Sequence, residues 1–160
     1  MSNILIIVAA VAAFVISSVI GKFLIPELHR IKFGQPIRDE GPKWHQKKSG
    51  TPTMGGIMFI VAAVLVSVIC YAVLSIIEPG ARDFQDHLKF YAGIVMAVLF
   101  GVIGFIDDYI KVVKKHNQGL TEKQKLVLQF LVAIAYVFTL IIGGCSSKTV
   151  IPFAGTIDLG

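Results

Sequence analysis

Gly101-Val-Ile-Gly-Phe-Ile-Asp-Asp-Tyr-Ile-Lys111 is the stretch that decides the fold, because an apolar run from Leu88 ends there at two adjacent carboxylates, Asp107 and Asp108. Ionisable groups at or just inside a bilayer are costly, and they normally mark a site for an ion, a substrate or a cofactor. If the run is helical, Lys111 lies one turn beyond both acids and helps to keep them ionised. The alternative interpretation is a solvated helix end just outside the membrane.

The composition indicates a membrane protein. Of the 160 residues, 55% are hydrophobic and only 16% are charged, which is too apolar for an ordinary soluble domain. The net charge of +5 lies in two blocks beside apolar runs, so we expect a lipid bilayer and anionic ligands as partners, and no nucleic acid. Cys70 and Cys145 lack the spacing of a metal site, and a disulfide between them is left open.

Four apolar runs are long enough to cross the hydrocarbon core, so the predicted fold class is an all-α integral membrane protein, a single polytopic segment over residues 1–160. The predicted spans are residues 4–25, 53–77, 88–106 and 126–142. Pro26 is expected to close the first span. Small residues recur every four positions in the first and third spans, which favours close helix packing. They are Ala9, Ala13, Ser17 and Gly21 in the first, and Gly93, Ala97 and Gly101 in the third.

The stripe of the third span continues through Gly104 to Asp108, so we expect Asp108 to face neighbouring helices. Asp107 lies about 100° further around the same turn. It can share one site with Asp108 only if this helix end is open to water.

Two polar segments, residues 27–49 and 111–125, together hold eleven Lys and Arg residues. The positive-inside rule makes both segments cytoplasmic loops and places both termini outside. Within the second loop, Gly119 is expected to end one helical segment, and Thr121 and Gln124 have the spacing of a capping box that opens the next. Residues 149–158 alternate weakly in hydropathy, which predicts a short external hairpin.

Lys48-Ser-Gly-Thr-Pro-Thr-Met-Gly-Gly56 opens the second span. Thr51 as the N-cap and Pro52 as the first helical residue explain part of it. Lys48, Thr53 and the two glycines would leave backbone and hydroxyl groups open beside a cation, which suits a phosphate at a helix N-terminus. Close packing at the glycines is an equally good structural explanation.

Three stretches resemble, in the same order, motifs of the phospho-N-acetylmuramoyl-pentapeptide transferase (MraY, translocase I) family. They are Lys48–Ile57, Gly104–Val113 and Gly119–Lys125, and Lys32-Phe-Gly-Gln-Pro36 stands where the family has a similar motif. The resemblance runs from the first span to the final residue and looks like the amino-terminal half of a fold with about ten membrane helices. The family's downstream Asn/Asp loop, third Asp and His-rich loop are absent here, so we expect the segment to be inactive without its downstream half.

The resemblance implies transfer of phospho-MurNAc-pentapeptide from UDP-MurNAc-pentapeptide to undecaprenyl phosphate, giving lipid I and UMP for peptidoglycan synthesis at the bacterial plasma membrane. It implies that Asp107 and Asp108 are catalytic and hold Mg²⁺, with the division of roles between them left open. It also implies a set of phosphate-binding side chains that supply charge and hydrogen-bond donors. These are Lys48, Thr53, Lys111, Lys115, Lys123 and Lys125.

Two other interpretations fit parts of the sequence. A sister enzyme that transfers GlcNAc-1-phosphate from UDP-GlcNAc to a polyprenyl phosphate would share much of this pattern, although Thr-Pro-Thr-Met-Gly-Gly and Phe-Ile-Asp-Asp-Tyr favour the muramoyl enzyme. A non-catalytic four-helix membrane module, with small-residue stripes that form a homodimer and lysines that bind anionic lipid, explains the spans and the basic loops. It gives no reason for the paired acids or for Lys48.

Overall fold

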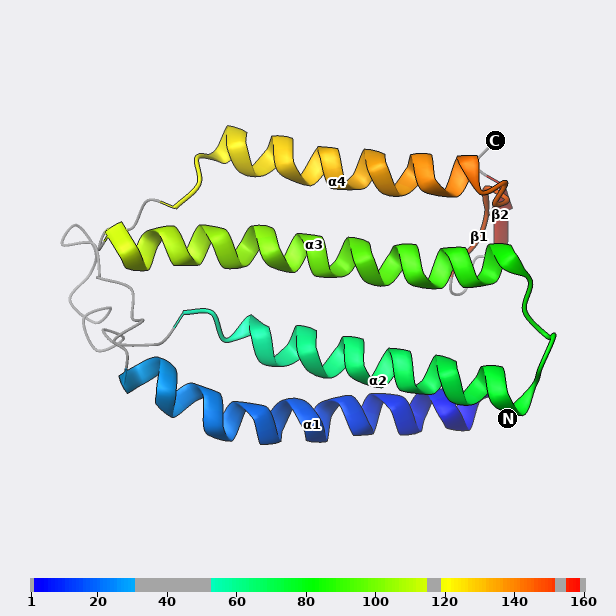
Figure 1. Cartoon of the computed structure of the whole chain (residues 1–160), viewed down its shortest axis with the longest axis horizontal. Coiled ribbons are helices and arrows are strands. Elements are labelled where there is room, and N and C mark those ends of the chain that lie inside the picture. Colours follow the sequence, from blue (N-terminus) through cyan, green and yellow to red (C-terminus); the bar gives the residue numbers. More distant parts are fainter. Residues whose placement is uncertain (1, 31–52, 115–118, 152–154, 159–160) are drawn as a thin grey trace.

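The computed structural model describes residues 2–30, 53–114, 119–151 and 155–158. Four long helices lie in a row: α1 (Ser2–Arg30), α2 (Gly56–Ile77), α3 (Phe84–Lys114) and α4 (Glu122–Ile142) (Figure 1). Each packs against its neighbour in the sequence, and within the described residues α1 packs against neither α3 nor α4, so the row is open. Consecutive helices run in opposite directions. We call the end that holds Asp107 and Asp108 the aspartate end; α1 and α3 finish there, and α2 and α4 start there.

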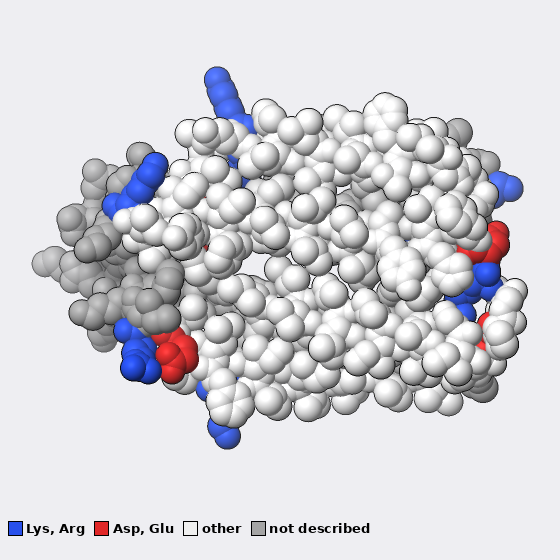
Figure 2. All heavy atoms as spheres, in the orientation of Figure 1, with Lys and Arg blue, Asp and Glu red and all other residues white. Residues whose placement is uncertain are grey.

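All four helices are long and apolar enough to cross a membrane, which confirms the predicted all-helical class and the four spans. Large apolar side chains are exposed along the helices, for example Phe14, Phe59 and Phe138. Figure 2 shows the charged side chains gathered towards the two ends, with a broad uncharged belt between them. Such a belt suits contact with lipid, because helices satisfy their own backbone polar groups. The chain is a multi-pass membrane protein.

Two of the helices extend further into the polar segments than we predicted. The expectation that Pro26 closes the first helix is wrong, because α1 continues to Arg30. A proline inside a helix removes one N–H and crowds the carbonyl four residues earlier, and this can bend a helix without ending it. The third helix continues beyond both acids to Lys114, so Asp107 and Asp108 lie inside α3 and not at its end.

The second helix starts later than predicted. Met54 has a φ of 69°, in the left-handed region, so a right-handed helix cannot extend back through it. α2 therefore begins at Gly56, with Gly55 at the N-cap position and no side-chain cap. Thr51 and Pro52 lie outside the described residues. No described atom would lie within 4 Å of a Cβ placed on Gly55 or Gly56, so close packing does not explain this pair.

The small-residue stripes are used at two positions, both against α2. A Cβ on Gly21 of α1 would lie 2.8 Å from the sulfur of Met58, and one on Gly101 of α3 would overlap the side chain of Ile60. These glycines therefore permit the close approach of neighbouring helices, as predicted. A Cβ on Gly93 or Gly104 would meet no described atom within 4 Å.

At the far end, β1 (Lys148–Ile151) pairs antiparallel with β2 (Gly155–Asp158), with Lys148 opposite Asp158. A hydrogen bond ties the start of α3 to the residues just after α4, since Gln85 Nε2 donates to the carbonyl oxygen of Gly144 at 2.6 Å. Cys70 and Cys145 are both free, so the disulfide that the sequence left open is not formed.

Candidate active site

Asp107 is a buried carboxylate whose oxygens both have close partners. The residue is only 5% exposed. Its Oδ2 lies 2.7 Å from Lys111 Nζ and 3.0 Å from Lys125 Nζ, and its Oδ1 accepts a hydrogen bond from the backbone N–H of Leu120 at 3.0 Å. A buried charge is tolerated when it is paired and hydrogen-bonded in this way.

Asp108 faces a different part of the chain. Its Oδ2 accepts a hydrogen bond from the backbone N–H of Met54 at 3.3 Å, just before α2, and its Oδ1 lies 3.2 Å from Lys111 Nζ. Asp108 therefore contacts the segment that leads into α2, and its facing a neighbouring helix itself stays a prediction. Its side chain is 30% exposed, against 7% for Asp107. Asp108 is therefore the acid that a ligand can reach more easily.

Lys111 lies between the two acids. The i+4 and i+3 spacing predicted this position, and the ion pairs at 2.7 Å to Asp107 and 3.2 Å to Asp108 confirm it. The Lys111 side chain is 20% exposed, so its ammonium group is largely withdrawn from water. Lys111 joins the two acids directly. That they share one site only if this helix end is open to water stays a prediction.

The described residues just before α4 lie directly against Asp107. Thr121 Oγ1 accepts from the Gln124 N–H at 3.3 Å, and Gln124 Oε1 accepts from the Thr121 N–H at 3.0 Å, so the predicted capping box is confirmed. It fixes the start of α4, from whose first turn Lys125 reaches Asp107. A Cβ on Gly119 would overlap the Asp107 carboxylate and lie 2.6 Å from the Asp107 carbonyl oxygen. Glycine therefore permits the close approach of these residues to α3.

A hollow of about 440 Å³ opens beside Asp107. Two cations, a second carboxylate, the N-cap threonine and two residues of the connection between α3 and α4 surround it. The lining residues are Asp107, Lys111, Gly119, Leu120, Thr121, Glu122 and Lys125. Such a site can hold an anionic group next to the ammonium groups, and Asp108 lies on the other side of Lys111.

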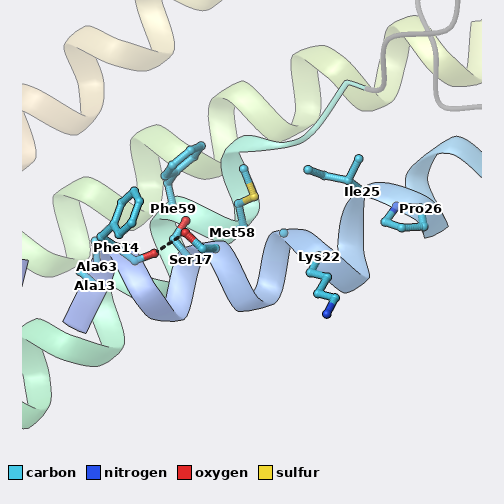
Figure 3. Close-up of a pocket in the computed structure, with 11 residues that line it drawn as sticks. Ala13, Phe14, Ser17, Lys22, Ile25, Pro26, Met58, Phe59 and Ala63 are labelled. Carbon is cyan, nitrogen blue, oxygen red and sulfur yellow. Dashed lines mark hydrogen bonds between the residues drawn. The ribbon is translucent and has the colours of Figure 1, made fainter. Parts of the chain in front are cut away.

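A larger hollow of about 640 Å³ lies between α1 and α2 and is mostly apolar (Figure 3). Phe14, Met58 and Phe59 line it, and Lys22 points away from α2. The hydroxyl of Ser17 is buried there without a hydrogen-bond partner among the described residues. No acid of the described part of the chain lines this hollow, so the paired carboxylates make the aspartate end the better candidate for chemistry.

Comparison with known proteins now separates the interpretations. Residues 48–60 match phospho-N-acetylmuramoyl-pentapeptide-transferase signature 1. A phospho-N-acetylmuramoyl-pentapeptide-transferase of Bacillus anthracis is 52% identical over 134 residues, which are 82% of this chain and 38% of that protein. One of Bacillus cereus (strain AH187) is 50% identical over 152 residues, which are 94% of this chain and 43% of that protein. The chain matches the amino-terminal part of the transferases of this family.

The chain spans about two fifths of the length of these transferases. The matched signature includes Met54, whose N–H bonds to Asp108. The family signature and the acid pair, which are far apart in the sequence, are therefore in direct contact.

The structure brings together only some of the predicted site residues. Asp107, Asp108, Lys111 and Lys125 form one connected group. Thr53 is half-buried immediately before Met54. Lys123 is exposed in the first turn of α4, and no described contact joins it to either acid. Lys48 and Lys115 lie outside the described residues.

Two contacts of the acids were not predicted from the sequence, and in both the donor is a backbone N–H. The N–H groups of Met54 and Leu120 bind Asp108 and Asp107. Every non-proline residue carries an N–H, so side-chain type gave no signal for these contacts. The glycines beside them, Gly55 and Gly119, were the only local hint of unusual backbone.

The two acids of this candidate site fit a magnesium ion unequally. Among the described residues, no group of three or more His, Cys, Asp and Glu side chains could hold a metal ion. Mg²⁺ commonly takes one or two carboxylates and completes its shell with water and substrate phosphates, so the partly exposed Asp108 fits. Asp107 does not fit as it is placed, because it is only 5% exposed and two ammonium groups already pair with its Oδ2.

Proposed function

We propose that this chain is part of an enzyme that transfers phospho-MurNAc-pentapeptide from UDP-MurNAc-pentapeptide to undecaprenyl phosphate, giving lipid I and UMP for peptidoglycan synthesis. The observation that carries the proposal is the contact between the signature segment and the acid pair, through the Met54 N–H and Asp108 Oδ2. Since the chain spans about two fifths of its relatives, the remaining length would supply further groups for both substrates.

The proposed reaction joins two anionic substrates. An oxygen of the lipid phosphate attacks the phosphorus that bears the sugar, a new P–O bond forms, and the bond to UMP breaks. Lys111 offers an ammonium group at the aspartate end, and Thr53 and Lys123 lie at the same end. Lys48 and Lys115 complete the proposed phosphate-binding set, whereas Lys125 is paired with Asp107. Such groups lower the cost of bringing phosphates together.

Asp108 is the residue of this chain that we assign to the reacting phosphates. It can orient the lipid phosphate, accept its proton or hold Mg²⁺. When bound, the ion would neutralise phosphate charge and polarise the P–O bond that breaks. Lys111 would keep the Asp108 carboxylate pointed along the same face of α3, because it is paired with Asp108 Oδ1 at 3.2 Å.

We propose an orientation in the bacterial plasma membrane with the aspartate end in the cytoplasm and both termini outside. The eleven cations of residues 27–49 and 111–125 support it by the positive-inside rule. It would place the acid pair where a soluble nucleotide sugar is available, while the lipid substrate arrives through the bilayer. A homodimer stays a prediction.

The test uses the completed enzyme, which we define as this chain joined in frame to the remaining length of the Bacillus cereus relative. It is purified in detergent and supplied with Mg²⁺, undecaprenyl phosphate and either UDP-MurNAc-pentapeptide or UDP-GlcNAc. We expect lipid I and UMP from the muramoyl donor alone. Consumption of UDP-GlcNAc alone would favour the sister transferase, and no turnover of either donor would favour a non-catalytic membrane module.

A further inference from the structure

Asp107 and Asp108 are adjacent in the sequence, yet their surroundings differ in kind. Asp107 is almost fully buried and binds two ammonium groups and one amide, whereas Asp108 is partly exposed and binds one of each. From this difference we infer that Asp107 is a positioning residue, and that Lys125 acts through Asp107 and not on the substrate. The inference deepens the proposed transfer reaction and rests on it for its kinetic readout.

The partners of Asp107 come from three separate pieces of the chain. Lys111 lies in α3, Leu120 in the connection after it, and Lys125 in the first turn of α4. The carboxylate therefore fastens α4 to α3 at the aspartate end. It also fixes Lys111, whose Nζ lies 2.7 Å from Asp107 and 3.2 Å from Asp108. Because Lys111 pairs with both acids, Asp107 helps to fix the orientation of the Asp108 carboxylate.

A substrate-binding role for Asp107 would require it to lose these partners. A phosphate or a metal ion at its Oδ2 would have to displace one or both ammonium groups. Breaking a buried ion pair is costly because a charge is left without compensation. The connection lies directly against this carboxylate, since even a Cβ on Gly119 would overlap it.

Lys125 is tied to the same carboxylate. Its Nζ lies 3.0 Å from Asp107 Oδ2, and its side chain is 40% exposed. A lysine that bound substrate phosphate directly would contribute to substrate affinity, so removing it would raise KM. A lysine that acts by holding Asp107 would instead change the geometry of the reacting groups, so removing it would lower kcat.

The experiment is a double-mutant cycle in the completed enzyme. It compares Lys125→Gln, Asp107→Asn and the double variant with the unchanged enzyme, and measures kcat and both KM values for lipid I formation. Lys125→Arg tests rescue by a conservative change. Lys114→Gln is the matched control, because Lys114 is an exposed lysine near the same end of α3.

We expect Lys125→Gln to lower kcat roughly tenfold with KM within about twofold, and Lys125→Arg to retain activity within about threefold. In the Asp107→Asn background, Lys125→Gln should cost no more than about twofold, because the group through which Lys125 acts is already altered. Losses that multiply in the double variant, or a tenfold rise in KM with kcat unchanged, would overturn the inference.

A second readout separates this inference from the proposed function. Thermal unfolding of the same four proteins in detergent measures the coupling between Asp107 and Lys125 without any substrate. If the completed enzyme makes no lipid I, the proposed function fails. The inference about Asp107 and Lys125 is then still supported if the double variant loses no more in unfolding midpoint than the more destabilised single variant. Losses that add up in the double variant would overturn it.

Discussion

The backbone N–H of Met54 donates a hydrogen bond to Asp108 Oδ2 at 3.3 Å, across 54 positions of sequence. Met54 makes this contact from the left-handed region, with a φ of 69°, while its side chain is buried at 7% exposure. Such a conformation costs a non-glycine residue roughly 1–2 kcal/mol, so the surrounding structure must hold it in place. The strained turn links the family signature to the acid pair.

Substitutions at Met54 test whether this backbone conformation matters. Leucine keeps a similar volume, whereas valine adds a β-branch that tolerates positive φ poorly. We expect Met54→Val to lower the free energy of unfolding by about 1–3 kcal/mol more than Met54→Leu, and to reduce kcat through Asp108. Denaturation in detergent and the lipid I assay measure the two effects. Equal stability of the two variants would mean that the left-handed turn is not required.

Gly119 should be intolerant of a side chain. In Gly119→Ala the new methyl group would press on the Asp107 carboxylate and on its carbonyl oxygen, and overpacking of this kind costs about 1–3 kcal/mol. The matched control is Gly104→Ala in α3, where a Cβ would meet no described atom within 4 Å. We expect the control to be neutral or slightly stabilising in thermal unfolding, because alanine favours helix. The same destabilisation in both variants would argue against the close approach.

The capping box should stabilise the start of α4. Thr121→Ala removes the hydroxyl that accepts from the Gln124 N–H, and loss of such a cap costs about 0.5–2 kcal/mol. Thr121→Ser keeps the acceptor and should restore most of the stability. Because Lys125 follows in the first turn, we also expect Thr121→Ala to lower kcat slightly. A stability unchanged by alanine and serine alike would show that the α4 start is held by other contacts.

Local rules predicted the parts of the structure that depend on local spacing. Hydropathy located the four helices, the i+3 and i+4 spacing placed Lys111 between the acids, and the Thr121–Gln124 spacing gave the capping box. Each of these depends on residues within one helix turn, or on apolar length alone. The signature motif was enough to indicate the family.

The rest depends on contacts between segments. The two acids are the same residue type, and their surroundings differ because of contacts with distant segments. Leu120 and Lys125 bind Asp107, whereas the Met54 N–H binds Asp108. Pro26 predicted a helix end, but α1 continues through it to Arg30. The positive φ of Met54 had no side-chain signal, since glycine is the residue that usually adopts it.

Membrane orientation can be tested with two exposed lysines at opposite ends of the molecule. Lys123→Cys and Lys148→Cys are introduced separately after Cys70 and Cys145 are replaced by serine. If the aspartate end is cytoplasmic, an impermeant thiol reagent added to intact cells should label position 148 and leave position 123 unlabelled. Permeabilised cells provide the control for reactivity at position 123. The reverse labelling would invert the proposed topology.

The central claim is that Asp108 is the acid that works on the substrates and Asp107 the acid that holds the site together. The most direct measurement is the rate of lipid I formation by the completed enzyme carrying Asp108→Asn or Asp107→Asn, each at saturating substrates and Mg²⁺. General acid or base catalysis contributes roughly 10²–10⁴-fold, so we predict a loss of at least about 10²-fold for Asp108→Asn. For Asp107→Asn we predict a loss of roughly 10–100-fold with KM little changed. Loss of all turnover in Asp107→Asn, with Asp108→Asn still active, would contradict the account.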